Sequence, residues 1–173
     1  MPTKAQDMRW QDMGIHLDEV LRLVGRINYA WSNTESLLIH FLAGLARVDN
    51  ETATILFLSL NTSRARLDLV KRLARAKCDD QVLEDRIIKF TAEMSSLGKQ
   101  RNALNHSLYA FDGDLGEVRT IEMRIADTAK GLKMGRQQVL DAAEVARIAK
   151  TIDRLVAVNA EAWSIIRSAN MPH

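Results

Sequence analysis

The placement of proline is the feature that most constrains the fold of this chain. The two prolines, Pro2 and Pro172, lie near the two ends of the 173 residues. Because proline lacks a backbone N–H and breaks helix interiors, the long interval between them is free to be helical. That interval is rich in Ala, Leu, Arg, Lys and Glu, which favour helices. The sequence therefore predicts a mostly helical protein, of a length typical of one domain.

Apolar residues recur at helical spacing along most of the chain, and their positions predict the helices. The pair Asp79 and Asp80 offers an N-terminal cap for the third of these helices. Between the first two, residues 51–60 (ETATILFLSL) are nearly uncharged, and we expect this segment to be buried. The predicted helices span residues 16–48, 64–77, about 81–109 and about 140–168.

The pattern changes between the last two predicted helices. The stretch AFDGDLGEV contains turn-forming Asp-Gly and Leu-Gly pairs. Ile121, Met123 and Ile125 then alternate with charged residues, as they would in a strand. Two glycines bracket a further apolar stretch, LKM, so a small β-hairpin and a plain loop both fit this region.

Together these patterns predict the architecture. We expect an all-α antiparallel helical bundle of about four to five helices, with a small β-hairpin or loop insertion before the last helix. The insertion is placed at residues 111–138. We expect residues 1–173 to form a single domain, in which residues 1–14 are a flexible N-terminus.

Composition narrows the setting in which the protein works. The single cysteine, Cys78, can form no disulfide within the chain, as is typical of a reducing compartment. The first residues, MPTKAQDMRWQDMG, lack the apolar core of a signal peptide, and no stretch of membrane-spanning length is free of charge. We therefore expect a cytoplasmic protein with no membrane partner. Because the sequence has no glycine-rich phosphate loop and no histidines at metal-ligand spacing, we expect no cofactor and no metal.

Two charged residues stand where the periodicity places the hydrophobic core. Arg101 lies in the middle of the apolar stripe of the helix predicted at 81–109. Glu35 lies between Trp31 and Leu38 in the apolar arc of the first predicted helix. Desolvated charges are tolerated mainly when they are paired, so we expect Glu35 and Arg101 to meet across the bundle. A purely structural ion pair would explain these two residues as well.

A polar face adjoins Arg101 on the same predicted helix. Asn102 and His106 are four residues apart and share this face, and the small residues Ser95 and Gly98 lead up to them. Such a face suits water or a second subunit. The imidazole of His106 can exchange a proton near neutral pH, and the guanidinium of Arg101 is a fixed donor for phosphate. The two project about 140° apart on an ideal helix, so a helix end or a second subunit must bring substrate between them.

The six residues RNALNH, from Arg101 to His106, resemble the motif of the HEPN superfamily. The long first helix with its mid-helix Glu35, and the final helix after a short insertion, are also similar to that family. The resemblance implies homodimers whose motif-bearing helices face each other across a cleft, with metal-independent RNA cleavage in many members. It also implies that His106 is the general base or acid at the ribose 2′-hydroxyl, that Arg101 holds the scissile phosphate, and that Asn102 orients substrate or histidine. The supporting residues of this candidate site are Glu35, Asn105 and Tyr109.

The helix predicted at 64–77 carries a cluster of basic residues that are RNA-binding candidates. Four of them project to roughly one side of the helix. No aromatic residue is interleaved with them for base stacking, and an ordinary solvated face explains them equally well. These candidates are Arg64, Lys71, Arg72 and Arg75.

Three functional interpretations follow from these observations. The leading one is a HEPN-like, metal-independent endoribonuclease of a toxin or defence system, whose partners are a second copy, RNA and an antitoxin or other protein. The second is a catalytically silent HEPN-like dimeric module that binds a protein or a nucleotide. The third is an unrelated helical bundle in which the motif is accidental. His106 separates the first two, because only the ribonuclease needs its imidazole.

Overall fold

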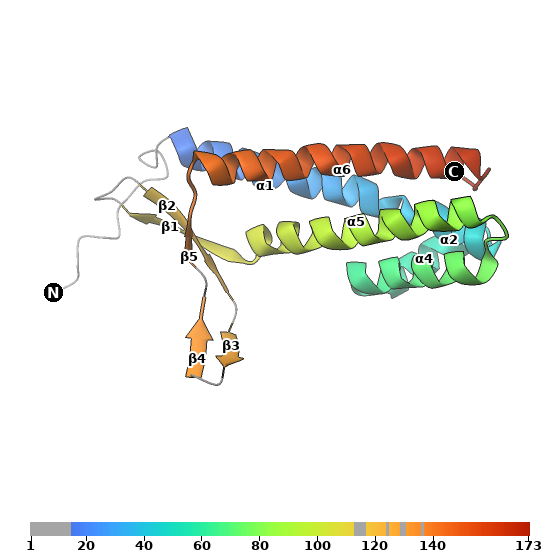
Figure 1. The fold of residues 1–173 in the computed structure, drawn as a ribbon, viewed down its shortest axis with the longest axis horizontal. Helices are drawn as coiled ribbons and strands as arrows, with labels where there is room; N and C mark the ends of the chain where they lie inside the picture. The colour runs from blue at the N-terminus through green and yellow to red at the C-terminus, as the bar shows by residue number, and fades with distance from the viewer. Residues whose placement is uncertain (1–14, 113–116, 124, 129–130, 136) are drawn as a thin grey trace. The chain divides into compact units, whose positions relative to one another are not determined.

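The computed structural model describes residues 15–112, 117–123, 125–128, 131–135 and 137–173, and it confirms the predicted fold class (Figure 1). Within these residues helices predominate, and two small antiparallel sheets precede the last helix. The helices are α1 (Ile15–Ser36), α2 (Leu38–Ala46), α3 (Asn50–Ser59), α4 (Ser63–Lys77), α5 (Gln81–Asn105) and α6 (Ala142–Ser168). The strands are β1 (Ser107–Asp112), β2 (Glu117–Glu122), β3 (Ile125–Thr128), β4 (Gly131–Met134) and β5 (Gln137–Val139). The N-terminus predicted at residues 1–14 lies outside the described residues.

Contacts within the chain divide it into two compact units, each built from two stretches that are distant in sequence. The first, which we call the helical unit, comprises Ile27–Arg101 and Thr151–His173. It contains α2, α3 and α4 together with parts of α1, α5 and α6. The second, which we call the sheet unit, comprises the described residues of Met1–Arg26 and Asn102–Lys150 and contains the five strands.

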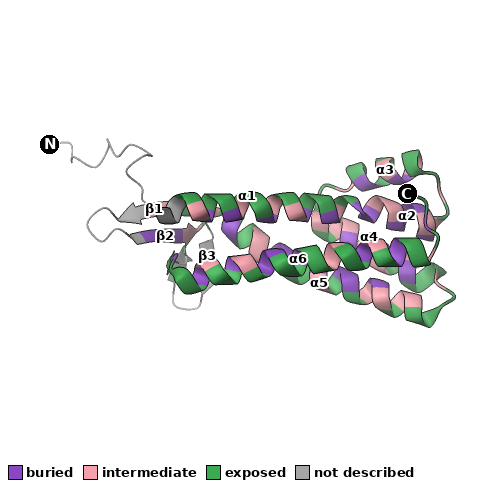
Figure 2. Cartoon of the chain, turned by 90° about the horizontal axis from the view of Figure 1, so that it is seen from above, coloured by how far each residue is buried: buried purple, intermediate pink, exposed green. Residues whose placement is uncertain are grey.

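The core of the helical unit is apolar, and each helix buries one side in it (Figure 2). Phe41 of α2 stacks on Phe90 of α5, with the two ring centroids 5.0 Å apart. The predicted apolar stripe of α5 is confirmed at Phe90, Met94 and Leu97, which are all buried. Burial of one large apolar side chain stabilises a fold by about 1.5–3 kcal/mol, so these residues hold α5 in place.

The single helix predicted at residues 16–48 is two helices in the structure. α1 ends at Ser36, and α2 begins at Leu38. Just before the break, the hydroxyls of Thr34 and Ser36 donate hydrogen bonds to the carbonyls of Ala30 and Asn33. The backbone N–H of Leu37 then bonds the carbonyl of Thr34, three residues back. Hydroxyl groups that bond the helix backbone bend helices, and this polar run ends α1 although the apolar period continues.

The expectation that residues 51–60 are buried is wrong. All but the last of them lie in α3, in which Ala53 and Phe57 are buried, whereas Ile55 and Leu58 are 58% and 64% exposed. α3 packs against α2, and a helix that packs on one neighbour buries only one of its sides. The uniform hydrophobicity of this segment therefore predicted more burial than the structure has.

The insertion before α6 forms two small sheets. In the larger one, β2 pairs antiparallel with both β1 and β5, and in the smaller one β3 pairs with β4. The larger sheet begins at Ser107, which pairs with Glu122, so the third helix ends at Asn105 and not near residue 109 as predicted. The residues SLYAFD suit a strand as well as a helix, and pairing with β2 selects the strand.

A close contact between α5 and α1 gives a prediction about packing. A Cβ added at Gly98 would lie 2.8 Å from Cη2 of Trp31, which is 2% exposed, so this part of the predicted polar face is filled by an indole ring. We expect Gly98→Leu to lower the free energy of unfolding by about 2–3 kcal/mol, because the core is overpacked. Gly25 of α1 is the matched control, since nothing lies within 4 Å of a Cβ there. Gly25→Leu should raise the free energy of unfolding by about 0.5–1 kcal/mol through helix propensity. Denaturant unfolding compares the two, and equal responses would contradict the contact.

Candidate functional site

The motif residues occupy the end of α5 and the turn that follows it. Arg101, Asn102 and Asn105 lie in the last part of the helix, and His106 lies in the turn between α5 and β1. The backbone N–H of His106 donates to the carbonyl of Asn102 over 3.0 Å, and its carbonyl accepts from the N–H of Met123 over 3.0 Å. The side chains of Asn102, Asn105 and His106 are exposed. The backbone of His106 is thus held from two sides while its imidazole faces solvent.

Arg101 is half-buried and is held by α1. Its Nε donates a hydrogen bond of 2.8 Å to Oδ1 of Asn28, and its guanidinium lies 5.9 Å from the ring centroid of Trp31. An amide oxygen and an aromatic face both restrict how a guanidinium can turn. Asn28 and Trp31 therefore orient Arg101, and Asn28 is a site residue that the sequence analysis missed.

Glu35 does not have the partner that was expected. Its Oε1 lies 3.2 Å from Nη1 of Arg66 on α4, and its Oε2 accepts a hydrogen bond of 3.0 Å from Nε1 of Trp31. Arg66 also donates to the carbonyl of Phe57 and lies over the Phe57 ring, 4.1 Å from its centroid. The expected pairing of Glu35 with Arg101 is therefore wrong. A helical projection locates a charge around its helix axis but does not locate the neighbouring helix that will supply its partner.

A signal for Arg66 is present in the sequence. Arg66 is next to Leu67 and four residues before Val70, both of which are buried, so it borders the apolar stripe of α4. The same criterion that singled out Glu35 and Arg101 also applies to this arginine. Trp31 connects the two polar clusters, because its indole N–H bonds Glu35 while its ring lies beside Arg101.

Tyr109, expected in the site, lies on β1 and is half-buried. Its hydroxyl donates a hydrogen bond of 3.1 Å to the carbonyl of Leu104, which belongs to the last turn of α5. Burial raises the pKa of Tyr109, so the phenol stays protonated and keeps donating. A carbonyl at a helix end needs such a partner, and Tyr109 thereby joins the end of α5 to the sheet.

The four basic candidates all lie on α4 in the helical unit. Arg64, Arg72 and Arg75 are exposed, and Lys71 is half-buried. Nε of Arg64 lies 3.8 Å from the carboxylate of Asp68 on the same helix, a contact that contributes little at this exposure. Exposure of this kind is expected both of an RNA-facing surface and of an ordinary solvated one.

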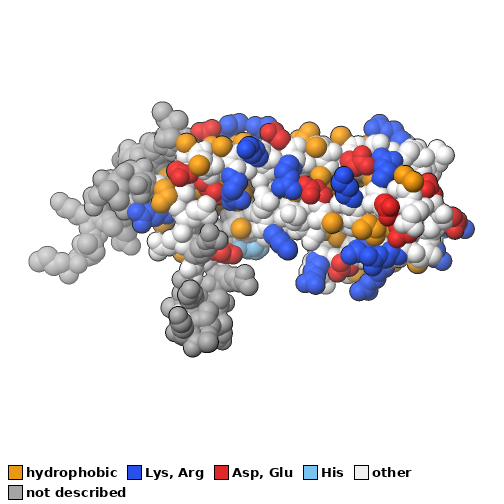
Figure 3. Space-filling model, viewed as in Figure 1, with side chains coloured by type: hydrophobic (Ala, Val, Ile, Leu, Met, Phe, Trp, Pro, Cys, Tyr) orange, Lys and Arg blue, Asp and Glu red, His pale blue; other side chains and the backbone are white. Residues whose placement is uncertain are grey.

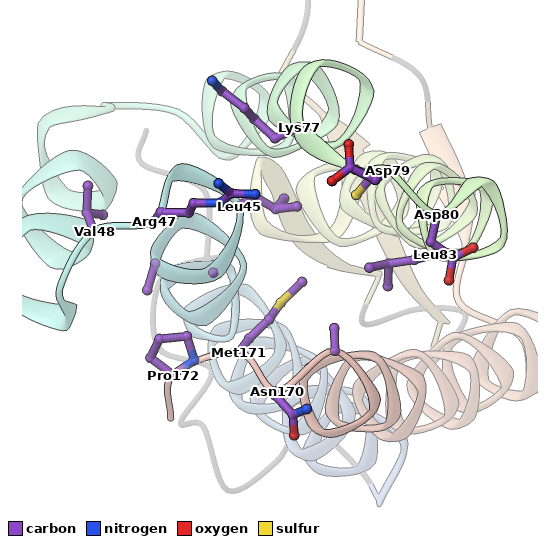
Figure 4. Close-up of a pocket in the computed structure, with 14 residues that line it drawn as sticks. Leu45, Arg47, Val48, Lys77, Asp79, Asp80, Leu83, Asn170, Met171 and Pro172 are labelled. Carbon is purple, nitrogen blue, oxygen red and sulfur yellow. The ribbon is translucent and has the colours of Figure 1, made fainter.

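The helical unit also has a cavity of about 490 Å³ near the C-terminal ends of α2, α4 and α6. In Figure 4, Leu83 and Met171 extend toward one another at this cavity, and the charged side chains of Arg47 and Asp79 lie nearby. Cys78 is in its lining, and burial raises the pKa of this thiol, which disfavours the reactive thiolate. No residue of the predicted site lines this cavity, so it is separate from the motif.

Two further findings concern the described part of the chain. Among its residues, no three His, Cys, Asp or Glu side chains gather closely enough to hold a metal ion. None of the helices seen there combines the length and apolar character that crossing a membrane requires.

Comparisons of the chain with models of protein families, with curated proteins and with solved structures gave no match. The function proposed below therefore rests on the geometry at the end of α5.

Proposed function

We propose that this chain is a HEPN-like, metal-independent endoribonuclease whose catalytic residues are Arg101, Asn102 and His106. The observation that carries the proposal is the position of His106 directly after the last residue of α5, with its backbone hydrogen-bonded and its side chain exposed. Arg101 lies in the last part of α5, and Asn28 of α1 orients it through a hydrogen bond. The sequence allowed substrate to reach both Arg101 and His106 in two ways, at a helix end or at a second subunit. The two residues lie at the end of α5, which supports the first of these.

The residue types suit transesterification of RNA. His106 accepts the proton of the ribose 2′-hydroxyl, and the 2′-oxygen forms a bond to the adjacent phosphorus. The bond from phosphorus to the 5′-oxygen breaks, and that oxygen takes up a proton from water, while the imidazolium of His106 returns its proton to water. Arg101 stabilises the charge that develops on the phosphate oxygens, and Asn102 orients the substrate or the imidazole. The products are a 2′,3′-cyclic phosphate and a 5′-hydroxyl, and DNA is not cut because it lacks the 2′-hydroxyl.

The proposal extends to setting and partners. The enzyme acts in the cytoplasm as a homodimer, as a toxin or defence protein that an antitoxin or another protein partner restrains. Glu35, Asn105 and Tyr109 support the site, Glu35 through Trp31 and Tyr109 through the last turn of α5. RNA is held in addition by the basic side of α4, formed by Arg64, Lys71, Arg72 and Arg75.

One observation favours a second candidate function. Arg101 already bonds Asn28 and lies beside Trp31, contacts that suit a structural role in the helical unit. In a catalytically silent HEPN-like module, Arg101 and Glu35 would hold the fold while the exposed end of α5 binds a protein partner or a nucleotide.

Cleavage of a mixed RNA pool by the purified protein, in the presence of EDTA, tests the proposal. We expect cleavage, with 2′,3′-cyclic phosphate ends that mass spectrometry identifies, and no cleavage of DNA of the same sequences. Cleavage that stops when EDTA is added would contradict the metal-independent mechanism. An intact RNA pool would favour the silent module.

A further inference from the structure

A shallow groove of about 340 Å³ runs between α5 and α6 in the helical unit. Its apolar lining comes from Phe90 of α5 and from Ala157 and Val158 of α6. Charged side chains stand at both of its ends. Figure 3 shows the face over these two helices, where acidic and basic side chains alternate around hydrophobic ones.

Four charges mark the corners of the groove. At one end, Nε of Arg86 on α5 donates to Oε1 of Glu161 on α6 over 2.9 Å. At the other end, Nε of Arg154 on α6 donates to Oε1 of Glu93 on α5 over 2.9 Å. The two helices run antiparallel, so each carries one cation and one anion, and the signs alternate around the four corners. The side chains are 31–47% exposed and can still meet a partner.

This alternation matches a second copy of the same surface. When two identical faces meet, the two-fold axis lies in the plane between them. An axis parallel to the helices places α5 of each copy opposite α6 of the other. Arg86 then faces Glu161 of the second copy, and Glu93 faces Arg154, so every corner meets the opposite charge. Helices that face each other run antiparallel, as in a four-helix bundle.

The other in-plane axis is disfavoured by Lys89, which lies midway between Arg86 and Glu93 on α5. An axis perpendicular to the helices would bring Lys89 onto Lys89 of the second copy. The parallel axis instead lays the aliphatic stem of Lys89 over Ala157 and Val158 of the second copy, where its methylene groups cover apolar surface.

We propose that the groove between α5 and α6 is a homodimer interface with its two-fold axis parallel to these helices. Because the axis is parallel to α5, the ends of both α5 helices, each with an Arg101, lie at the same end of the dimer. The inference deepens the proposed function, which includes a homodimer, and it rests on that function for its biological role. Association itself depends only on the groove.

Two opposite charge reversals, made separately and then mixed, test the interface. Arg86→Glu gives two anions at one end of the groove, and Glu161→Arg gives two cations there. We expect sedimentation at one protein concentration to show a dimer for the wild type. Each variant alone should dissociate about a hundredfold more readily, because like charges then face each other. An equimolar mixture should recover dimers that contain one copy of each, which a mass tag on one variant identifies.

Controls separate association from folding and from catalysis. Circular dichroism and melting verify that each variant is folded, and Arg64→Glu, a reversal at an exposed arginine of α4, should leave the dimer unchanged. A monomeric wild type, variants that remain dimeric, or a mixture that stays monomeric would each overturn the interface. Because the readout is mass, a dimer that cuts no RNA overturns the proposed nuclease alone. A monomer that cuts RNA overturns the interface and the homodimer and leaves the nuclease chemistry in place.

Discussion

Replacing His106 with alanine is expected to slow RNA cleavage by about 10²–10⁴-fold and to leave the melting temperature unchanged. The loss is expected because proton transfer from the ribose 2′-hydroxyl would then have no acceptor in the site. The stability should persist because residue 106 is held by its backbone N–H and carbonyl, both of which alanine retains. Its imidazole is exposed and belongs to no part of the core.

Single-turnover cleavage of a labelled RNA, together with thermal melting, measures both effects. Ser95→Ala is the matched control on α5, because Ser95 is exposed and lies before the motif, and it should cleave at the wild-type rate. Added imidazole should restore part of the activity of His106→Ala if a missing proton acceptor is the cause. A His106→Ala variant that cuts RNA as fast as the wild type would remove His106 from the mechanism.

Replacing Arg66 with methionine should lower the free energy of unfolding by about 3 kcal/mol, which is the scale for breaking a buried ion pair. Arg66 and Glu35 are 18% and 12% exposed, so the methionine would leave a carboxylate with little access to water. The variant would also lose the hydrogen bond to the carbonyl of Phe57 and the contact with the Phe57 ring.

A double-mutant cycle isolates the ion pair from these other contacts. Glu35→Gln alone should also be destabilising, while the variant with both changes should lose less stability than the two single losses added together. Urea unfolding gives the three values. Strictly additive losses would show that the 3.2 Å contact contributes nothing as a pair. The same cycle with Arg101→Met in place of Arg66→Met should show a much smaller coupling, because Arg101 bonds Asn28 and reaches Glu35 through their shared neighbour Trp31.

Local sequence patterns were sufficient for much of the fold. Apolar spacing located α4, α5 and α6 to within a few residues, apart from the end of α5, because the side of a helix that packs must be apolar at every turn. The motif from Arg101 to His106 could also be recognised from the sequence, because its charged and polar side chains interrupt an otherwise apolar helical period. The sequence of the region before α6 was compatible with strands and with a loop. Strand pairing in the structure shows that the region forms strands.

Contacts between distant segments decided the rest. Pairing with β2 ended α5 at Asn105, and His106 therefore lies in the turn after the helix and not in the last turn of the helix, as predicted. Arg66 became the partner of Glu35, and Asn28 became the partner of Arg101, because helix packing sets which side chains come within hydrogen-bonding distance. Periodicity reports the side of a helix that is buried, and a hydrogen bond additionally needs the distance to another helix, which depends on the whole packed arrangement.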